Sequence, residues 1–268
     1  MTLTIKDASG ESVRTLKVDG TTGLNRAWWN LEYDPAHVVK LRTPPPDAPW
    51  VQLPREGWRP IVSLMSFQGA PRVAPGTYTV QLSVNGKQLS ETMVVQRDPN
   101  SEATSQTIGE EVAFSREVLG EYNRVADMIN QLEWDSKQVM DLKAMLTDRG
   151  DRDHTLEPTR NLEAKIIGLE DKLFQIHVTS VSIEEGISMP MRLYEKMAGL
   201  LDAVVRGNAT GGSAGFAPTE AEIAVNKIYQ QELGDCQREF QQLTDKDLPA
   251  FNEKLKESHL AVAIAREQ

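Results

Sequence analysis

The chain has 268 residues, 40% hydrophobic and 25% charged, which is ordinary for a globular protein with one large or two medium domains. Its net charge of −10 is uneven, because residues 1–100 hold 11 Lys and Arg against 9 Asp and Glu, and the acidic excess lies in the remainder. Such an acidic half argues against nucleic acid or anionic lipid as a partner, and no apolar run is long enough for membrane insertion. The single Cys236 excludes an internal disulfide and a cysteine zinc site.

The first 31 residues predict three short strands. Residues 2–5 and 13–18 alternate polar and apolar side chains, and a Gly-containing loop at 7–11 joins them into a hairpin. Residues 24–31 are expected to form a third strand, in which alternation buries one of Trp28 and Trp29 and exposes the other. The inward-facing residues of the hairpin are predicted to be Leu3, Ile5, Val13, Leu16 and Val18.

A second hairpin ends the β region. Residues 78–84 and 87–96 alternate, and Asn85-Gly86 between them is a strong signal for a tight two-residue turn. Short strands separated by turn residues predict an all-β immunoglobulin-like sandwich over residues 1–98.

A Pro- and Trp-rich insertion at 40–60 interrupts this pattern. Its prolines keep the segment extended and exclude it from a central strand. Two interpretations stay open and are compatible: the insertion is a docking or glycan-contact surface, or it folds back over its own sandwich. The candidate contact residues are Trp50, Trp58, Pro44, Pro45 and Pro46.

After a linker at 99–107, the apolar period changes from two to about 3.5 residues. One helix of about 40 residues is predicted from residue 108, closed by the charged segment 148–153, with Ser136 and Lys143 filling two gaps in its apolar seam. The predicted seam residues are Val118, Tyr122, Val125, Ile129, Leu132, Val139 and Leu146.

Further helices complete the predicted region 108–258. The second ends near 183–186, the third begins near Pro190, and a Gly-, Ala- and Ser-rich loop at 207–217 precedes the fourth, which starts at Pro218-Thr219-Glu220. A short last turn has Leu255 inward, and residues 259–268 form a tail. Heptad-type seams predict an antiparallel α-helical bundle or coiled-coil hairpin, although they could also serve an oligomer of unknown size. The predicted seam of the second helix is Leu162, Ile166, Leu169, Leu173 and Ile176. That of the third is Leu193, Met197, Leu200 or Leu201, and Val204, and that of the fourth is Tyr229, Leu233, Cys236, Phe240 and Leu243.

The sequence contains no pattern that predicts catalysis. The four histidines, His37, His154, His177 and His259, lie in separate segments without metal-ligand spacing. Adjacent carboxylates such as Glu184 and Glu185 point about 100° apart on a helix, which suits a solvated face better than acid–base work. We therefore predict no catalytic residues, no metal and no cofactor.

Several motifs resemble the C-terminal region of bacterial sortilin-type β-propeller proteins, also called BNR-repeat or glycosyl-hydrolase-like proteins. The sandwich also resembles the immunoglobulin-like domain of the flagellar hook-capping protein. In the propeller family helices follow the sandwich, and residues 247–252 are similar to its closing segment. The motifs are Leu3-Thr4-Ile5-Lys6-Asp7, residues 23–35 around Trp28-Trp29, Arg42-Thr43-Pro44-Pro45-Pro46, residues 70–78 around Pro75-Gly76-Thr77-Tyr78, and Arg97-Asp98-Pro99.

The resemblance implies a structural accessory module that docks on, or extends, a β-propeller protein exported to the periplasm or cell exterior. Any hydrolase activity of that family would lie in a propeller that this chain lacks. A carbohydrate-binding module that stacks Trp50 and Trp58 on sugar rings is the alternative, and a hydrolase subunit is a third reading. The chain carries no signal peptide pattern of its own.

Overall fold

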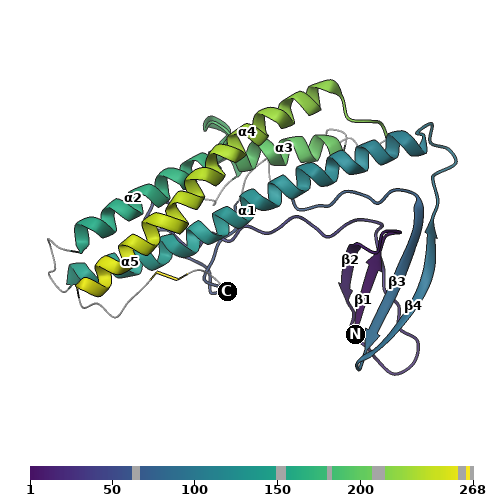
Figure 1. Ribbon diagram of the computed structural model, residues 1–268, viewed down its shortest axis with the longest axis horizontal. Coiled ribbons are helices and arrows are strands. Elements are labelled where there is room, and N and C mark those ends of the chain that lie inside the picture. Colours follow the sequence, from purple (N-terminus) through teal and green to yellow (C-terminus); the bar gives the residue numbers. More distant parts are fainter. Residues whose placement is uncertain (62–66, 149–154, 180–182, 207–214, 259–263, 266–268) are drawn as a thin grey trace. The chain divides into compact units, whose positions relative to one another are not determined.

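The computed structural model describes residues 1–61, 67–148, 155–179, 183–206, 215–258 and 264–265. It is an α+β protein, with a four-stranded antiparallel sheet in its N-terminal part and helices in its C-terminal part (Figure 1). Several features named in the sequence lie outside the described residues. They are His154, His259, the segment 149–153, most of the loop 207–217 and most of the tail.

The chain forms two compact units, and each is built from separate stretches of sequence. The sheet unit comprises Met1–Ala36, Phe67–Gly120 and Leu200–Ile223. The helical unit comprises His37–Ser66, Glu121–Gly199 and Ala224–Gln268. The insertion predicted at 40–60 therefore belongs with the helices, and the helices contribute residues to both units.

Both predicted hairpins are confirmed. The first joins β1 (Thr2–Lys6) to β2 (Ser12–Lys17), and the second joins β3 (Gly76–Val84) to β4 (Lys87–Val95), in the sheet order β2-β1-β3-β4 (Figure 1). Asn85 and Gly86 have φ of 50° and 77°, so both central turn residues are left-handed, as a type I′ hairpin turn requires.

The strand predicted at 24–31 does not form. Leu24 is 95% exposed, and the Asn25 side chain ties back to the backbone of Thr21 and Gly23, which closes a local loop. Leu31 then turns the chain with a left-handed φ of 62°, and only Glu32 makes an isolated bridge, to Arg72. Local side-chain-to-backbone bonds compete here with the sheet ladder.

The predicted split of the tryptophan pair is confirmed, since Trp28 is 80% exposed and Trp29 is half-buried. Trp29 packs edge-on against Tyr78, with ring centroids 5.6 Å apart. Among the described residues the strands form one open sheet, and extended chain around Trp29 and Val73, rather than a second sheet, covers part of its apolar face.

A β-bulge shapes the core of the sheet unit. Ile5 pairs with Arg14 and Lys6 pairs with Ser12, so Val13 is the extra residue. The bulge turns Val13 toward the core side, where it clusters with Ile5, Val73 and Tyr78. Ile5, Val13 and Leu16 thus pack in the core as predicted, whereas Leu3 and Val18 remain half-exposed outside this cluster.

The predicted long helix is confirmed. Helix α1 (Ser105–Asp148) has 44 residues, which corresponds to about 66 Å. It begins three residues before the predicted start, because the Thr104 hydroxyl accepts the Thr107 N–H at 3.1 Å and caps the first turn. Its seven predicted seam residues are all at 0% exposure: Val118, Tyr122, Val125, Ile129, Leu132, Val139 and Leu146.

The remaining helices follow the predicted order. They are α2 (Leu156–Leu173), the 3₁₀ turn η1 (Ile183–Ser188), α3 (Leu193–Arg206), α4 (Glu220–Gln242), the π-helical turn η2 (Leu243–Asp247) and α5 (Leu248–Glu257). Their predicted seam residues are buried, except that Tyr229 and Phe240 are half-buried. At the start of α4, Thr219 and Glu222 form a reciprocal capping box.

The predicted end of the second helix was wrong. Helix α2 stops at Leu173, because Phe174 is extended (φ −151°, ψ 169°) and is itself buried. The seam residue Ile176 is buried, but from the extended chain that follows the helix.

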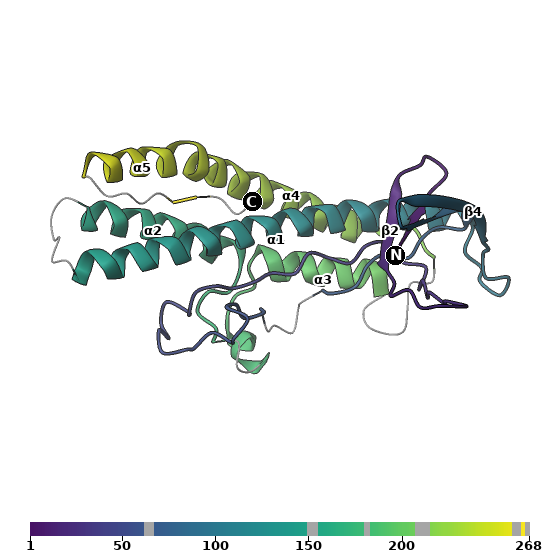
Figure 2. The ribbon, with the colours of Figure 1, turned by 90° about the horizontal axis from the view of Figure 1, so that it is seen from below.

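Contacts between several pairs of helices hold the helical unit together. Helices α1 and α2 pack together through the Lys143–Glu163 ion pair at 2.6 Å, and Tyr122 on α1 stacks on Tyr194 on α3. Lys165 on α2 reaches Asp247 at 2.7 Å, and Figure 2 shows α5 running beside α2. None of the described helices has an apolar stretch long enough to cross a bilayer.

Candidate functional site

Residues 37–43, here called the strap, lie in extended form against α1. The side chains of Asn123, Asp127, Asn130 and Glu133 recur on one face of that helix and bind the strap. Asn130 accepts the Lys40 N–H at 2.8 Å and donates to the Val38 carbonyl at 3.0 Å. Side chains of a helix thus satisfy backbone groups that a sheet would otherwise pair.

Leu41 and Arg42, near the end of the strap, make two further contacts. Leu41 and Arg59 exchange both backbone hydrogen bonds, at 2.9 and 2.8 Å, so the chain doubles back on itself. The Arg42 guanidinium lies 5.3 Å from the centre of the Trp134 ring on α1. Beyond the prolines, Asp47 pairs with His177 at 2.6 Å.

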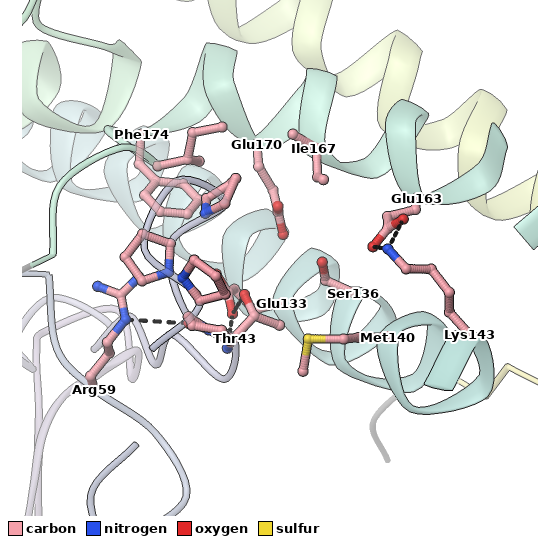
Figure 3. Close-up of a pocket in the computed structure, with 15 residues that line it drawn as sticks. Thr43, Arg59, Glu133, Ser136, Met140, Lys143, Glu163, Ile167, Glu170 and Phe174 are labelled. Carbon is pink, nitrogen blue, oxygen red and sulfur yellow. Dashed lines mark hydrogen bonds and ion pairs between the residues drawn. The ribbon is translucent and has the colours of Figure 1, made fainter. Parts of the chain in front are cut away.

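A pocket of about 200 Å³ lies beneath the prolines that follow the strap, and is here called the strap pocket. One wall consists of Thr43, Arg59 and four prolines, the second of α1 residues, and the third of α2 and the chain after it. Figure 3 shows Glu133, Ser136 and Met140 on the α1 side and Ile167, Glu170 and Phe174 on the α2 side. The site therefore forms where the insertion crosses the α1–α2 pair.

Glu133 is the anchor of the strap. Its Oε2 accepts the N–H of Arg42 at 2.6 Å and the N–H and hydroxyl of Thr43 at 2.9 and 3.0 Å. Burial raises the pKa of Glu133, while these hydrogen bonds and the charge of Arg59 oppose the rise. An oxygen engaged three times by the backbone and a hydroxyl serves positioning rather than proton transfer.

Glu170 faces the same pocket from α2 without such support. The residue is 3% exposed, and its Oε1 has no hydrogen-bond partner among the residues that the structure describes. Burial raises its pKa well above the ordinary glutamate value, and the negative charges of Glu133 and Asp135 add to the rise. Both effects favour the protonated, neutral form of Glu170.

The two cationic groups of the pocket are engaged away from Glu170. Arg59 is 6% exposed and its Nε donates to the Thr43 carbonyl at 3.3 Å. Burial lowers the pKa of Arg59, and the charge of Glu133 counters this. Lys143 binds both oxygens of Glu163 at 2.6 Å, as the dashed lines of Figure 3 show.

The structure brings together only some of the residues singled out in the sequence. Pro44, Pro45 and Pro46 line the strap pocket. Trp58 is half-buried, and the Lys40 ammonium lies 5.8 Å from the centre of its ring. Trp50 is 74% exposed and does not line the pocket. The insertion belongs to the helical unit, where its backbone hydrogen-bonds to side chains of α1.

The sheet unit offers a second feature, a row of four leucines across all its strands. Leu16 pairs with Leu3, Leu3 with Leu82, and Leu82 with Leu89, so this leucine row crosses β2, β1, β3 and β4 at one level. The first three are half-buried and Leu89 is 63% exposed. The neighbouring level on the opposite face is polar throughout, with Thr15, Thr4, Gln81 and Ser90.

Sequence reasoning missed Glu133, Glu170 and the asparagines of α1. The only available signal was their spacing, which places Asn123, Asn130 and Glu133 on one helical face next to the apolar seam. Within the described stretches, no three His, Cys, Asp or Glu residues gather in a way that could hold a metal ion.

Comparison with known proteins gives no match to a family model, to a curated protein or to a solved structure.

Proposed function

We propose that the chain is a non-catalytic accessory module whose sheet unit docks, through the leucine row, onto a β-propeller protein of the sortilin type that its motifs resemble. The half-exposed leucine row is the observation that supports this proposal. By the same resemblance, the location is exported, either periplasmic or extracellular.

The apolar face of the sheet is only partly covered within its own unit. The covering residues Trp29, Tyr33 and Val73 pack on Ile5 and Tyr78, one end of the face. The leucine row lies at the next level, where Leu89 remains largely exposed. In a sandwich a second sheet would bury this level, and burying one exposed leucine is worth about 1.5–3 kcal/mol.

A second detail supports an immunoglobulin-like origin for the sheet. The Tyr78 hydroxyl donates to the carbonyl of Ala74, four residues upstream, at 2.6 Å. A tyrosine whose hydroxyl hydrogen-bonds to the backbone just before its own strand is a recurrent feature of immunoglobulin-like domains, where it is called a tyrosine corner. The predicted sandwich would then be completed by the partner.

The test pairs two substitutions on β4. Leu89 and Val94 are 63% and 61% exposed, and they lie on opposite faces of this strand. Binding of the full chain to a sortilin-type propeller protein of the same genome is measured by calorimetry. Leu89→Lys is expected to weaken binding about tenfold or more, and Val94→Lys to leave it unchanged. Absence of wild-type binding, or equal losses in both variants, contradicts the proposal.

Glycan binding is the second candidate, supported by one observation. Trp50 exposes 74% of its surface beside the prolines, so its ring can stack on a sugar, whereas Lys40 already lies over the Trp58 ring. A glycan array with Trp50→Ala tests this, and Trp28→Ala, at an 80% exposed tryptophan, is the control. Loss of signal only in Trp50→Ala supports glycan binding, and equal signals in all three proteins exclude it.

A further inference from the structure

The strap pocket contains a buried acid, Glu170, one of whose carboxyl oxygens has no hydrogen-bond partner among the described residues. Glu170 is 3% exposed, its Oε1 lacks a hydrogen bond within the described part of the chain, and Figure 3 shows its carboxyl group pointing toward Glu133 and Ser136. A buried polar group without a partner is destabilising, and more so if it is charged. The pocket that it faces has room for a molecule of several atoms.

We propose that the strap pocket binds a small organic cation, a primary ammonium group on a short hydrocarbon stem, with Glu170 as its counter-ion. This site lies in the helical unit and does not depend on docking of the sheet.

The charges around Glu170 favour a cation. Glu133 and Asp135 on α1 both act on it with negative charge. Of the positive groups that line the pocket, Arg59 is turned to the Thr43 carbonyl and Lys143 is held by Glu163. An incoming ammonium therefore meets an uncompensated acid, whereas an anion would meet like charges.

The walls favour a short hydrocarbon stem. Met140, Ile167 and Phe174 provide apolar surface on the helix sides, and the prolines after the strap provide it opposite. Proline and phenylalanine rings pack well on methylene groups, and an aromatic face also attracts an ammonium group. A volume of about 200 Å³ admits a stem of a few carbons but not a large ligand.

Binding of the ammonium group is expected to release a proton from the protein. Burial and the neighbouring carboxylates raise the pKa of Glu170 in the free protein, so they favour its protonated form. When the ammonium group arrives, its charge stabilises the carboxylate, so the carboxyl proton leaves to the buffer. One cation enters and up to one proton is released, with no covalent bond made or broken.

The experiment uses the full chain and n-butylammonium chloride, titrated by calorimetry at pH 7 in two buffers of different ionisation enthalpy. We expect saturable 1:1 binding with proton release, and much weaker binding of n-butanol and of butyrate. The wild-type protein alone can overturn the proposal: failure to saturate, or equal affinity for n-butanol, shows that the pocket does not recognise an ammonium group.

Two variants on α2 locate the site. Glu170→Gln removes the counter-ion and is expected to weaken n-butylammonium binding about tenfold to a hundredfold and to abolish proton release. Glu157→Gln makes the same substitution at a side chain that is 63% exposed and outside the pocket, so its affinity should equal that of the wild type. Equal weakening in both variants would mean that binding does not depend on Glu170 in particular, and would refute the assignment.

Discussion

The Glu133 carboxylate on α1 accepts both the backbone N–H of Thr43, at 2.9 Å, and its hydroxyl, at 3.0 Å. Together with the Arg42 N–H at 2.6 Å, three donors from an irregular segment converge on one oxygen of a buried side chain. Among the residues that the structure describes, the only sheet-like pairing of the strap is the Leu41–Arg59 bridge, so the helix supplies the other acceptors.

Replacing this acceptor should destabilise the helical unit. Glu133→Ala leaves two buried backbone N–H groups without a partner, and we expect a loss of about 3 kcal/mol in the free energy of unfolding, measured with urea. Glu157→Ala, which removes an exposed glutamate of α2, serves as control and should change stability by less than about 0.5 kcal/mol. A similar small effect in both variants would mean that the strap is not held by Glu133.

Glu170 should make stability depend on pH. In acid it is protonated in both the folded and unfolded chain. As pH rises past the ordinary glutamate pKa of 4.5, the unfolded chain loses this proton while the folded chain keeps it, so stability falls toward neutral pH.

Glu170→Met removes both this titration and the unpaired group. We expect about 1–3 kcal/mol of added stability at pH 7 and a smaller gain at pH 4, from urea unfolding at each pH. A loss of stability at both values would contradict the burial of an unpaired acid.

Alanine substitutions at two glycines with free space around them should change the stability of the protein in opposite directions. An added Cβ meets no atom within 4 Å at Gly86 or Gly120. Gly86 has a φ of 77°, so Gly86→Ala should cost about 1–2 kcal/mol through backbone strain in the hairpin turn. Gly120 lies inside α1, where Gly120→Ala should add about 0.5–1 kcal/mol. Thermal unfolding followed by circular dichroism distinguishes the two signs.

Cys236 should report the opening of α4. The residue is buried, and desolvation followed by the charge of Glu239 raises the pKa of its thiol to about 11. At pH 8 the native chain should react with iodoacetamide more than about a hundredfold more slowly than the chain in urea, where the thiol is ordinary. Native labelling within tenfold of the unfolded rate would show that the α4 seam opens readily.

The helical seams were predictable because heptad spacing alone decides which side chains of a long helix meet a partner. Val118 through Leu146 kept one period over four heptads, and each predicted apolar seam residue proved fully buried. The Asn85-Gly86 turn was predictable for a similar reason, since few residues tolerate two successive left-handed conformations.

The strand at 24–31 and the strap pocket were not predictable, for different reasons. Alternation around Trp28 and Trp29 resembles a strand, but the bonds from Asn25 to Thr21 decide the local structure and are invisible in the apolar pattern. Glu170 follows Leu169 at the edge of the α2 seam, where glutamate normally reaches water. The prolines that help to close its pocket lie more than a hundred residues earlier in the sequence.

Because the two units are interleaved in the sequence, the chain cannot be cut into fragments that correspond to them. A fragment of residues 99–268 would carry Asn130 and Glu133 but lack the strap that they bind. A fragment of residues 1–98 would carry the strap without its helix. No single cut of the chain therefore separates the two units, because each is built from three stretches of sequence.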